Sequence, residues 1–187
     1  MKIIFLDIDG VLNGYNKFTC VIYNIAKQLH LLSLLRKHHD IFGVHETKVK
    51  RLSKIVKKTG AKIVISSSWR YAWARRNDKD TTNDIKKLER LFNKYNIEVI
   101  GITGTIPSEL TSSHRELEIK KWLDDNKELG IESFVVLDDE QFDLQRFIGK
   151  ELVQTSDSTY IKGEWNENTG LKRKHVKQAI KILNTIR

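Results

Sequence analysis

Cysteine and proline are almost absent from this sequence, with only Cys20 and Pro107 among 187 residues. A single cysteine excludes an internal disulfide and any metal site built from several cysteines. A single proline excludes a proline-rich linker or a collagen-like segment. The six histidines also lack the spacing of a zinc site. Stability must therefore come from a hydrophobic core, which a chain of this length can bury without such crosslinks.

Long apolar runs are missing as well. The N-terminal run Ile3–Leu6 stops at Asp7, so it is too short for the core of a signal peptide. No stretch reaches the roughly 18 apolar residues that a membrane span needs. We therefore expect no membrane span and a cytoplasmic location. The length predicts one domain over residues 1–187.

Basic charge is what the sequence has in excess. It contains 33 Lys and Arg against 24 Asp and Glu, which gives a formal net charge of +9. Such an excess favours anionic partners such as phosphorylated substrates, nucleic acid or an acidic surface. The basic stretch from Leu171 to Arg187 can bind nucleic acid, or it can simply form the solvated face of a helix.

Short apolar runs alternate along the chain with segments of helical periodicity. Strands are predicted at residues 2–8, 61–66, 97–100, 134–137 and 151–154. Helices are predicted at residues 21–37, 45–59, 83–95, 113–123 and from 171 onward. This alternation predicts an α/β fold of three layers, in which helices cover both faces of a mainly parallel sheet.

Polar residues follow three of the predicted strands. They are Asp7 and Asp9, Ser66 and Ser67, and Asp138 and Asp139. A sheet of this kind binds ligands outside the carboxyl ends of its strands, so these side chains are candidates for a site. Four carboxylates at one edge would repel one another unless a cation compensated their charge. Because carboxylate oxygens suit Mg²⁺, we expect a magnesium site there.

The first of these groups is an Asp-x-Asp-Gly motif. Asp7 and Asp9 are two residues apart, so on an extended chain both side chains point to one side. Gly10 then allows a sharp turn and a close approach of a ligand to the backbone. One carboxylate can attack an electrophile while the other transfers protons, whereas the alternative is a strand end with two solvated aspartates.

Hydroxyl and basic residues complete the candidate set. Ser66 and Ser67 can hold a phosphoryl oxygen, or they can serve as an ordinary helix cap. Arg70 can bind an anion or lie on the surface. Arg115, near the start of a predicted helix, can pair with a phosphoryl group and with Asp7. Lys120 is an alternative to Arg115, further along the same helix.

Taken together, these motifs resemble those of the haloacid dehalogenase (HAD) superfamily of phosphotransferases, in order as well as in type. The four matching pieces are Phe-Leu-Asp7-Ile-Asp9-Gly-Val-Leu-Asn, Ile63-Val-Ile-Ser-Ser67, Arg115 and Val-Val-Leu-Asp138-Asp139. A narrower likeness is to the small phosphatase domains grouped with nucleic-acid repair proteins. It is carried by Ser-Ser-Ser-Trp-Arg, Arg115-x-x-Glu118-Ile119-x-x-Trp122-Leu123, Leu152-Val-Gln-Thr and Thr169-Gly-Leu.

The resemblance implies a Rossmann-like fold and a role for each of these residues. Asp7 would be the nucleophile that forms an aspartyl-phosphate, and Asp9 would protonate the leaving oxygen and then activate water. Ser67 would bind the transferring phosphoryl group, with Ser66 as the alternative if the register differs by one. Arg115 would balance negative charge on Asp7 and the phosphoryl group. The dehalogenase branch of the superfamily lacks the second aspartate, so Asp9 indicates phosphate chemistry.

The resemblance also implies a metal site, a cap and a class of substrate. Mg²⁺ would be held by Asp7, the backbone carbonyl of Asp9, and Asp138, with Asp139 assisting. Residues 14–44 are long enough for a small helical cap, which would leave the site open to a macromolecular phosphate. Polynucleotide 3′-phosphate ends, nucleotides and phosphotyrosyl proteins are the candidate substrates.

Three other readings compete with a phosphatase. A signalling receiver domain carries its acid pair on the first strand, whereas here the pair comes last, so this reading is disfavoured. A basic module with inert carboxylates would bind nucleic acid in a salt-sensitive way without turnover. A metal-dependent nuclease would cut internal phosphodiesters instead of releasing terminal phosphate.

Overall fold

The computed structural model describes residues 1–13, 25, 43–106, 114–155, 159–161, 164–166 and 170–185. Nearly all of the predicted helix at 21–37 and of the predicted cap at 14–44 lies outside these residues. Both therefore stay predictions.

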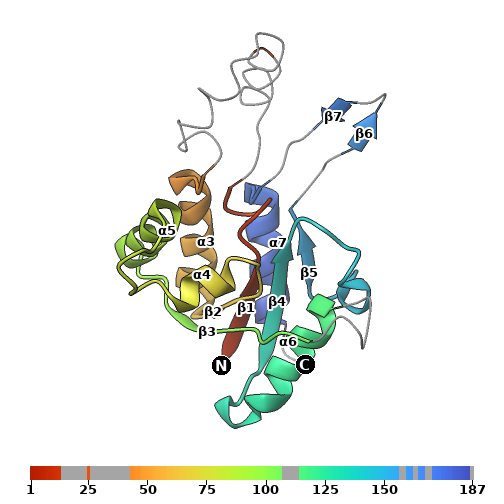
Figure 1. Ribbon diagram of the computed structural model, residues 1–187. Coiled ribbons are helices and arrows are strands. Elements are labelled where there is room, and N and C mark those ends of the chain that lie inside the picture. The colour runs from red at the N-terminus through yellow and green to blue at the C-terminus, as the bar shows by residue number, and fades with distance from the viewer. Residues whose placement is uncertain are drawn as a thin grey trace.

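A five-stranded parallel sheet forms the centre of the molecule (Figure 1). Its strands are β1 (Lys2–Leu6), β2 (Lys62–Ile65), β3 (Val99–Ile102), β4 (Ser133–Asp138) and β5 (Leu152–Gln154). They lie side by side in the order β3-β2-β1-β4-β5, and every neighbouring pair is parallel. The predicted α/β class with a mainly parallel sheet is confirmed, and the order is that of a Rossmann-like fold.

Helices cover both faces of this sheet. On one face lie α3 (Glu46–Thr59), α5 (Asn83–Lys94) and α7 (Arg173–Asn184), and on the other lies α6 (His114–Asp125) (Figure 1). The short helix α4 (Arg70–Ala74) follows β2. The helix α3 ends where Gly60 adopts a left-handed conformation, as its position in the sequence predicts.

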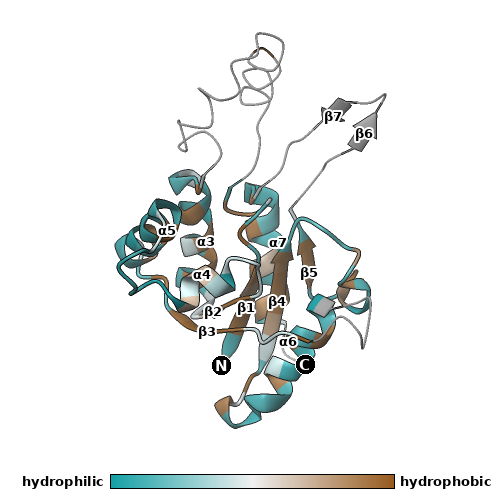
Figure 2. Cartoon of the chain, viewed as in Figure 1, coloured by the Kyte–Doolittle hydropathy of each residue, from teal (hydrophilic) through white to brown (hydrophobic). Residues whose placement is uncertain are grey.

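Two hydrophobic cores result from the alternation of side chains along the strands. Ile4 and Leu6 of β1 point to the face covered by α3, α5 and α7, whereas Ile3 and Phe5 point to α6. Phe5 meets Trp122 of α6 edge to face, with ring centroids 5.5 Å apart. Each such buried apolar side chain stabilises the fold by about 1.5–3 kcal/mol. The strands of the central sheet are accordingly the most apolar of the elements coloured in Figure 2.

Some elements differ from the predicted pattern. The first strand ends at Leu6 instead of at residue 8, because the chain turns after Ile8, whose carbonyl accepts hydrogen bonds from the N–H groups of Val11 and Leu12. An antiparallel hairpin of β6 (Thr159–Ile161) and β7 (Glu164–Asn166) was not predicted. The predicted edge strand at 151–154 is confirmed as β5. Within the described residues, no helix is both long enough and apolar enough to span a membrane.

Candidate active site

The candidate site lies where the order of the strands reverses, between β1 and β4 at the centre of the sheet. Asp7 follows β1 directly, and its backbone N–H still donates to the carbonyl of Leu137 at 2.9 Å. Asp138 is the last residue of β4, so the paired strands bring the two carboxylates to the same edge. In parallel sheets this point is the usual place for a ligand.

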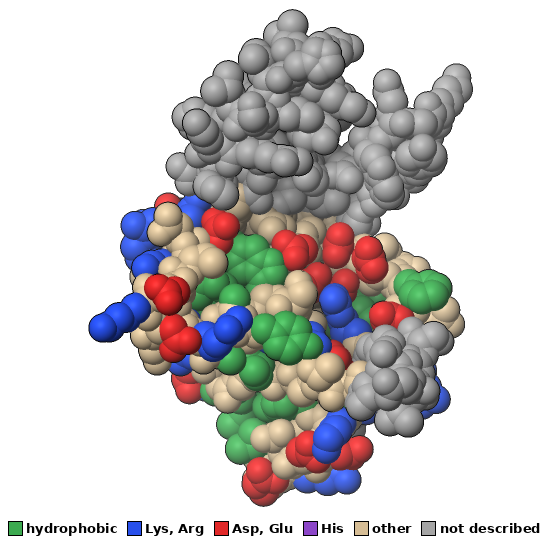
Figure 3. Space-filling view, in the orientation of Figure 1, with side chains coloured by type: hydrophobic (Ala, Val, Ile, Leu, Met, Phe, Trp, Pro, Cys, Tyr) green, Lys and Arg blue, Asp and Glu red, His purple; other side chains and the backbone are tan. Residues whose placement is uncertain are grey.

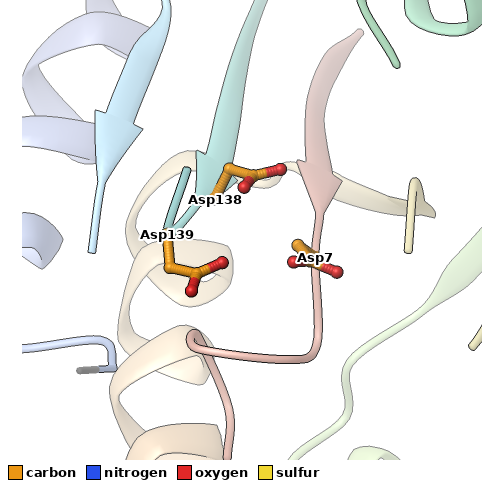
Figure 4. Close-up of side chains that lie close together, drawn as sticks. All are labelled: Asp7, Asp138 and Asp139. Carbon is orange, nitrogen blue, oxygen red and sulfur yellow. The ribbon is translucent and has the colours of Figure 1, made fainter. Parts of the chain in front are cut away.

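Three carboxylates converge at this edge. Asp7, Asp138 and Asp139 each offer an oxygen atom, and these atoms lie within 4.8 Å of one another (Figure 4). Asp7 and Asp138 are buried, whereas Asp139 is partly exposed. Figure 3 shows acidic side chains gathered on this part of the surface. An all-oxygen set of this kind fits a hard divalent cation such as Mg²⁺.

The charge of this cluster is poorly compensated by the protein itself. Burial, and then the neighbouring Asp138, raises the pKa of Asp7 from 3.8 to about 6. Burial, together with Asp138 and Asp7, raises the pKa of Asp139 from 3.8 to about 7. Burial also raises the pKa of Asp138 above its ordinary value. All three groups therefore gain from a nearby positive charge.

Arg115 supplies part of that positive charge. Its guanidinium lies 3.3 Å from the carboxylate of Asp7, and it forms a second, shorter ion pair with Asp138. Although burial opposes the charged form, Asp138 and Asp7 raise the pKa of Arg115 above its ordinary value. Arg115 is the second residue of α6, so the start of this helix fixes the guanidinium between the two carboxylates. The structure thus places Arg115 beside Asp7, and that Arg115 instead of Lys120 balances the phosphoryl charge stays a prediction.

Asp9 has a different environment from Asp7. Its carboxylate is exposed and lies outside the group of three converging carboxylates. One oxygen accepts a hydrogen bond from the amide of Asn13 at 2.6 Å, and the other accepts one from the indole of Trp69 at 3.0 Å. The side chain is therefore held by two neutral donors. That its backbone carbonyl binds a metal stays a prediction.

Gly10 allows the loop after β1 to approach the loop after β4. Its backbone has a φ of +64°, which non-glycine residues rarely adopt. A Cβ atom at this position would lie 2.1 Å from a carboxylate oxygen of Asp139. The hydroxyl of Thr155, just after β5, donates to the carbonyl of Gly10 at 2.8 Å, and the N–H of Thr155 donates to the carbonyl of Asp138 at 2.7 Å. One residue thus joins both acidic loops.

The two serines after β2 differ in their contacts. The side chain of Ser67 favours the charged form of Asp7 and so opposes the rise that burial causes in the pKa of that carboxyl. The hydroxyl of Ser66 is fully buried and has no hydrogen-bond partner among the described residues. This arrangement favours Ser67 over Ser66 as the hydroxyl that faces the candidate nucleophile.

Arg70 is buried and forms an ion pair of 2.8 Å with Glu118 of α6, which is also buried. It also donates to the backbone carbonyl of Ser67 at 3.3 Å. These contacts tie the loop after β2 to the helix that carries Arg115. That Arg70 binds substrate stays a prediction.

Sequence reasoning about the site missed Asn13 and Thr155, and it gave Trp69 and Glu118 no role. The motif that follows Asp9 contains Asn13, and the segment that follows Ser67 contains Trp69, so both stood inside pieces already singled out. Polar or aromatic residues near a predicted catalytic carboxylate or hydroxyl are the signal that could have found Asn13 and Trp69.

Comparison with known protein families identifies one model that covers most of the chain. Residues 3–164 match the model described as the HAD domain in Swiss Army Knife RNA repair proteins. Searches of curated proteins and of solved structures found no match. The matched region contains every residue of the acidic cluster and both serines, as well as Arg115. The chain therefore belongs to the HAD domains of Swiss Army Knife RNA repair proteins.

Proposed function

We propose that this protein is a magnesium-dependent phosphomonoester hydrolase that acts through an aspartyl-phosphate on Asp7. Membership of the HAD domains of repair proteins supports a HAD-type phosphatase. The observation that carries the proposal is the position of Asp7. It is a buried carboxylate that pairs with Arg115 and lies beside two further carboxylates, and Ser67 favours its charged form. Such a group can attack phosphorus only where cationic groups offset the repulsion between two anions.

The residues that would hold the metal are Asp7, Asp138 and Asp139, together with the backbone carbonyl of Asp9. When bound there, Mg²⁺ would neutralise charge on these carboxylates and on the phosphoryl oxygens. Arg115 would stabilise the same oxygens from the side of α6, and the hydroxyl of Ser67 would donate a hydrogen bond to one of them.

In the first step, a carboxylate oxygen of Asp7 forms a bond to phosphorus while the bond from phosphorus to the ester oxygen breaks. Asp9, in its protonated form, gives its proton to this departing oxygen, so the product leaves as an alcohol. The phosphoryl group is then covalently attached to Asp7 as a mixed anhydride.

In the second step, Asp9 is a carboxylate and removes a proton from water as the water oxygen bonds to phosphorus. The bond between phosphorus and Asp7 breaks, which returns Asp7 as a carboxylate and releases inorganic phosphate. Asp9 regains its proton from the water and is ready for another cycle. Proton transfer of this kind contributes about 10²- to 10⁴-fold to a rate.

We propose polynucleotide 3′-phosphate ends as the substrate class. The description of the matched family, which refers to RNA repair proteins, supports a nucleic-acid substrate. The formal net charge of +9 also favours a polyanion. Nucleotides and phosphotyrosyl proteins are the alternative substrates. A cytoplasmic location is also part of the proposal.

The test is release of inorganic phosphate from three substrates in parallel, with and without Mg²⁺. They are a 3′-phosphorylated oligonucleotide, a nucleotide and a phosphotyrosyl peptide. Asp7→Asn should abolish release, whereas the matched control Asp80→Asn, at an exposed position outside the site, should leave release unchanged. The substrate from which phosphate is released fastest identifies the substrate class. Salt-sensitive binding of the oligonucleotide without any release would instead indicate a binding module that retains a phosphatase fold.

A further inference from the structure

Both oxygens of the Asp9 carboxylate are held by donors that the catalytic scheme does not otherwise use. The indole Nε1–H of Trp69 donates to one oxygen at 3.0 Å, and the side-chain amide of Asn13 donates to the other at 2.6 Å. Asn13 is itself fixed, because its amide oxygen accepts a hydrogen bond from the backbone N–H of Gly10 at 2.9 Å. This second bond determines which end of the amide faces Asp9.

Trp69 reaches Asp9 from a well-anchored segment. Its carbonyl accepts a hydrogen bond from the N–H of Trp73 at 2.8 Å, and its own N–H points to the hydroxyl of Ser67 at 3.4 Å. The ring is partly buried and packs against the larger hydrophobic core. A side chain held at both its backbone and its ring can keep the indole N–H in one place.

The chemistry of the two donors suits this role. An indole nitrogen is a donor only and carries no charge, so it contacts the carboxylate without joining the exchange of protons. Two donors occupy two of the roughly four lone-pair positions of a carboxylate, which leaves positions free for the transferred proton. An exposed aspartate without such contacts would rotate among several rotamers, and most of them would point away from the leaving oxygen.

We propose that Trp69 is a positioning residue, which together with Asn13 fixes the carboxyl group of Asp9 for proton transfer to the leaving oxygen. This inference rests on the proposed phosphatase function, because it concerns the first step of that reaction. It assigns a reason for the tryptophan directly after the serines that follow β2. It also predicts that the contribution of Trp69 depends on how much help the leaving group needs.

The first experiment compares two esters in wild type and in Trp69→Phe, which keeps an aromatic ring and removes the N–H. Departure of p-nitrophenolate needs little protonation, whereas departure of an alkoxide from a nucleotide or polynucleotide phosphate needs it strongly. The alkyl ester for this test is the one that wild type hydrolyses fastest. For this ester, Trp69→Phe should lower kcat about 10-fold, with little change in KM. The loss for p-nitrophenyl phosphate should be several times smaller.

Trp73→Phe is the matched control, because Trp73 is a buried tryptophan one helical turn away that packs on Phe92. Any loss in this variant should be equal for the two esters. An equal loss for the two esters in Trp69→Phe as well would overturn the positioning role and leave Trp69 with a structural one.

A second measurement tests the contact without activity. The protein contains four tryptophans, and the absence of one indole N–H signal in Trp69→Phe identifies the resonance of Trp69 in a proton–nitrogen NMR spectrum. Asp9→Ala should shift this resonance upfield and speed its exchange with solvent. If the resonance does not move, Trp69 does not contact Asp9, even if the protein releases phosphate. If wild type releases phosphate from no ester, the proposed function fails and the catalytic role of Trp69 fails with it.

Discussion

Asp7 and Asp9 stand two residues apart in one motif, yet their surroundings have little in common. Asp7 is buried beside three charged side chains, those of Asp138, Asp139 and Arg115. Asp9 is exposed and is held by two neutral donors, Asn13 and Trp69. In the proposed mechanism, the group among charges attacks phosphorus near the metal, whereas the group held by neutral donors transfers the proton. The comparison teaches that environment separates the roles of two identical side chains.

The largest expected effect separates the two carboxylates directly. Asp7→Asn should remove both phosphate release and the covalent intermediate, because no carboxylate remains to attack phosphorus. Asp9→Asn should slow release by about 10²-fold or more, yet it should still allow Asp7 to be phosphorylated by p-nitrophenyl phosphate. Acid quenching followed by mass spectrometry of the peptide that contains Asp7 measures this difference. Equal phosphorylation of this peptide in the two variants would contradict separate roles for Asp7 and Asp9.

Arg115→Ala should have the next largest effect. Removing a group that stabilises charge in the transition state lowers kcat by about 10²- to 10³-fold. Arg115→Lys should recover part of this loss, because a lysine restores the charge but not the planar contact with two carboxylates. Lys120→Ala is the control on the same helix, and its steady-state kinetics should match those of wild type. A large loss of kcat in Lys120→Ala would indicate that Lys120 fills the role assigned to Arg115.

Metal-free stability should depend on pH in a direction that the acidic cluster determines. Burial raises the pKa of Asp7 to about 6 and of Asp139 to about 7, both above 3.8. The folded state therefore holds these protons more tightly than the unfolded state, so stability falls as the pH rises through this range. The Tm of metal-free protein should accordingly be lower at about pH 8 than at about pH 5.

Mg²⁺ should reverse this loss, because an ion that binds only the folded state stabilises it by mass action. The rise in Tm on adding Mg²⁺ should be larger at the higher pH, where the carboxylates are ionised. Asp139→Asn should raise the metal-free Tm at that pH and reduce the gain from Mg²⁺. Thermal unfolding with Mg²⁺ or with a chelator checks both expectations, and a Tm independent of pH and metal would contradict them.

Gly10→Ala should have the smallest effect on activity in this series, and that effect should act through the metal. A residue with a Cβ pays about 1–2 kcal/mol for a left-handed backbone conformation. The added carbon would also push against the carboxylate of Asp139. The concentration of Mg²⁺ that gives half-maximal phosphate release should therefore rise. Gly60→Ala, at another left-handed glycine but with open space around it, is the matched control and should leave this concentration unchanged.

Much of the fold could be predicted because burial on both faces leaves a direct mark on the sequence. The run Ile3–Leu6 predicts a buried strand because all four residues are apolar. In the structure all four side chains are inaccessible to solvent. The acids after β1 and β4 could be assigned to one edge because parallel strands end on the same side. These predictions needed only local pattern and topology.

The remaining features depend on contacts between distant parts of the chain. That Asp9 turns from the cluster toward Trp69 depends on a contact across 60 residues. The pairing of Arg70 with Glu118 spans 48 residues, so neither charge could be assigned a partner from its neighbours. The hairpin of β6 and β7 consists of strands three residues long, which are too short for a period of two to be recognised.

The contacts of Thr155 also bear on the order in which the molecule folds. This residue joins the loop after β1 to the end of β4, so this contact beside the acidic cluster forms only when segments 145 residues apart have come together. Repulsion among the carboxylates therefore destabilises the native state more than a transition state for folding in which the cluster has not yet formed. Neutralising Asp139 should consequently slow unfolding while leaving the folding rate nearly unchanged. The site that is suited to catalysis would in this way act as the point from which the metal-free protein begins to open.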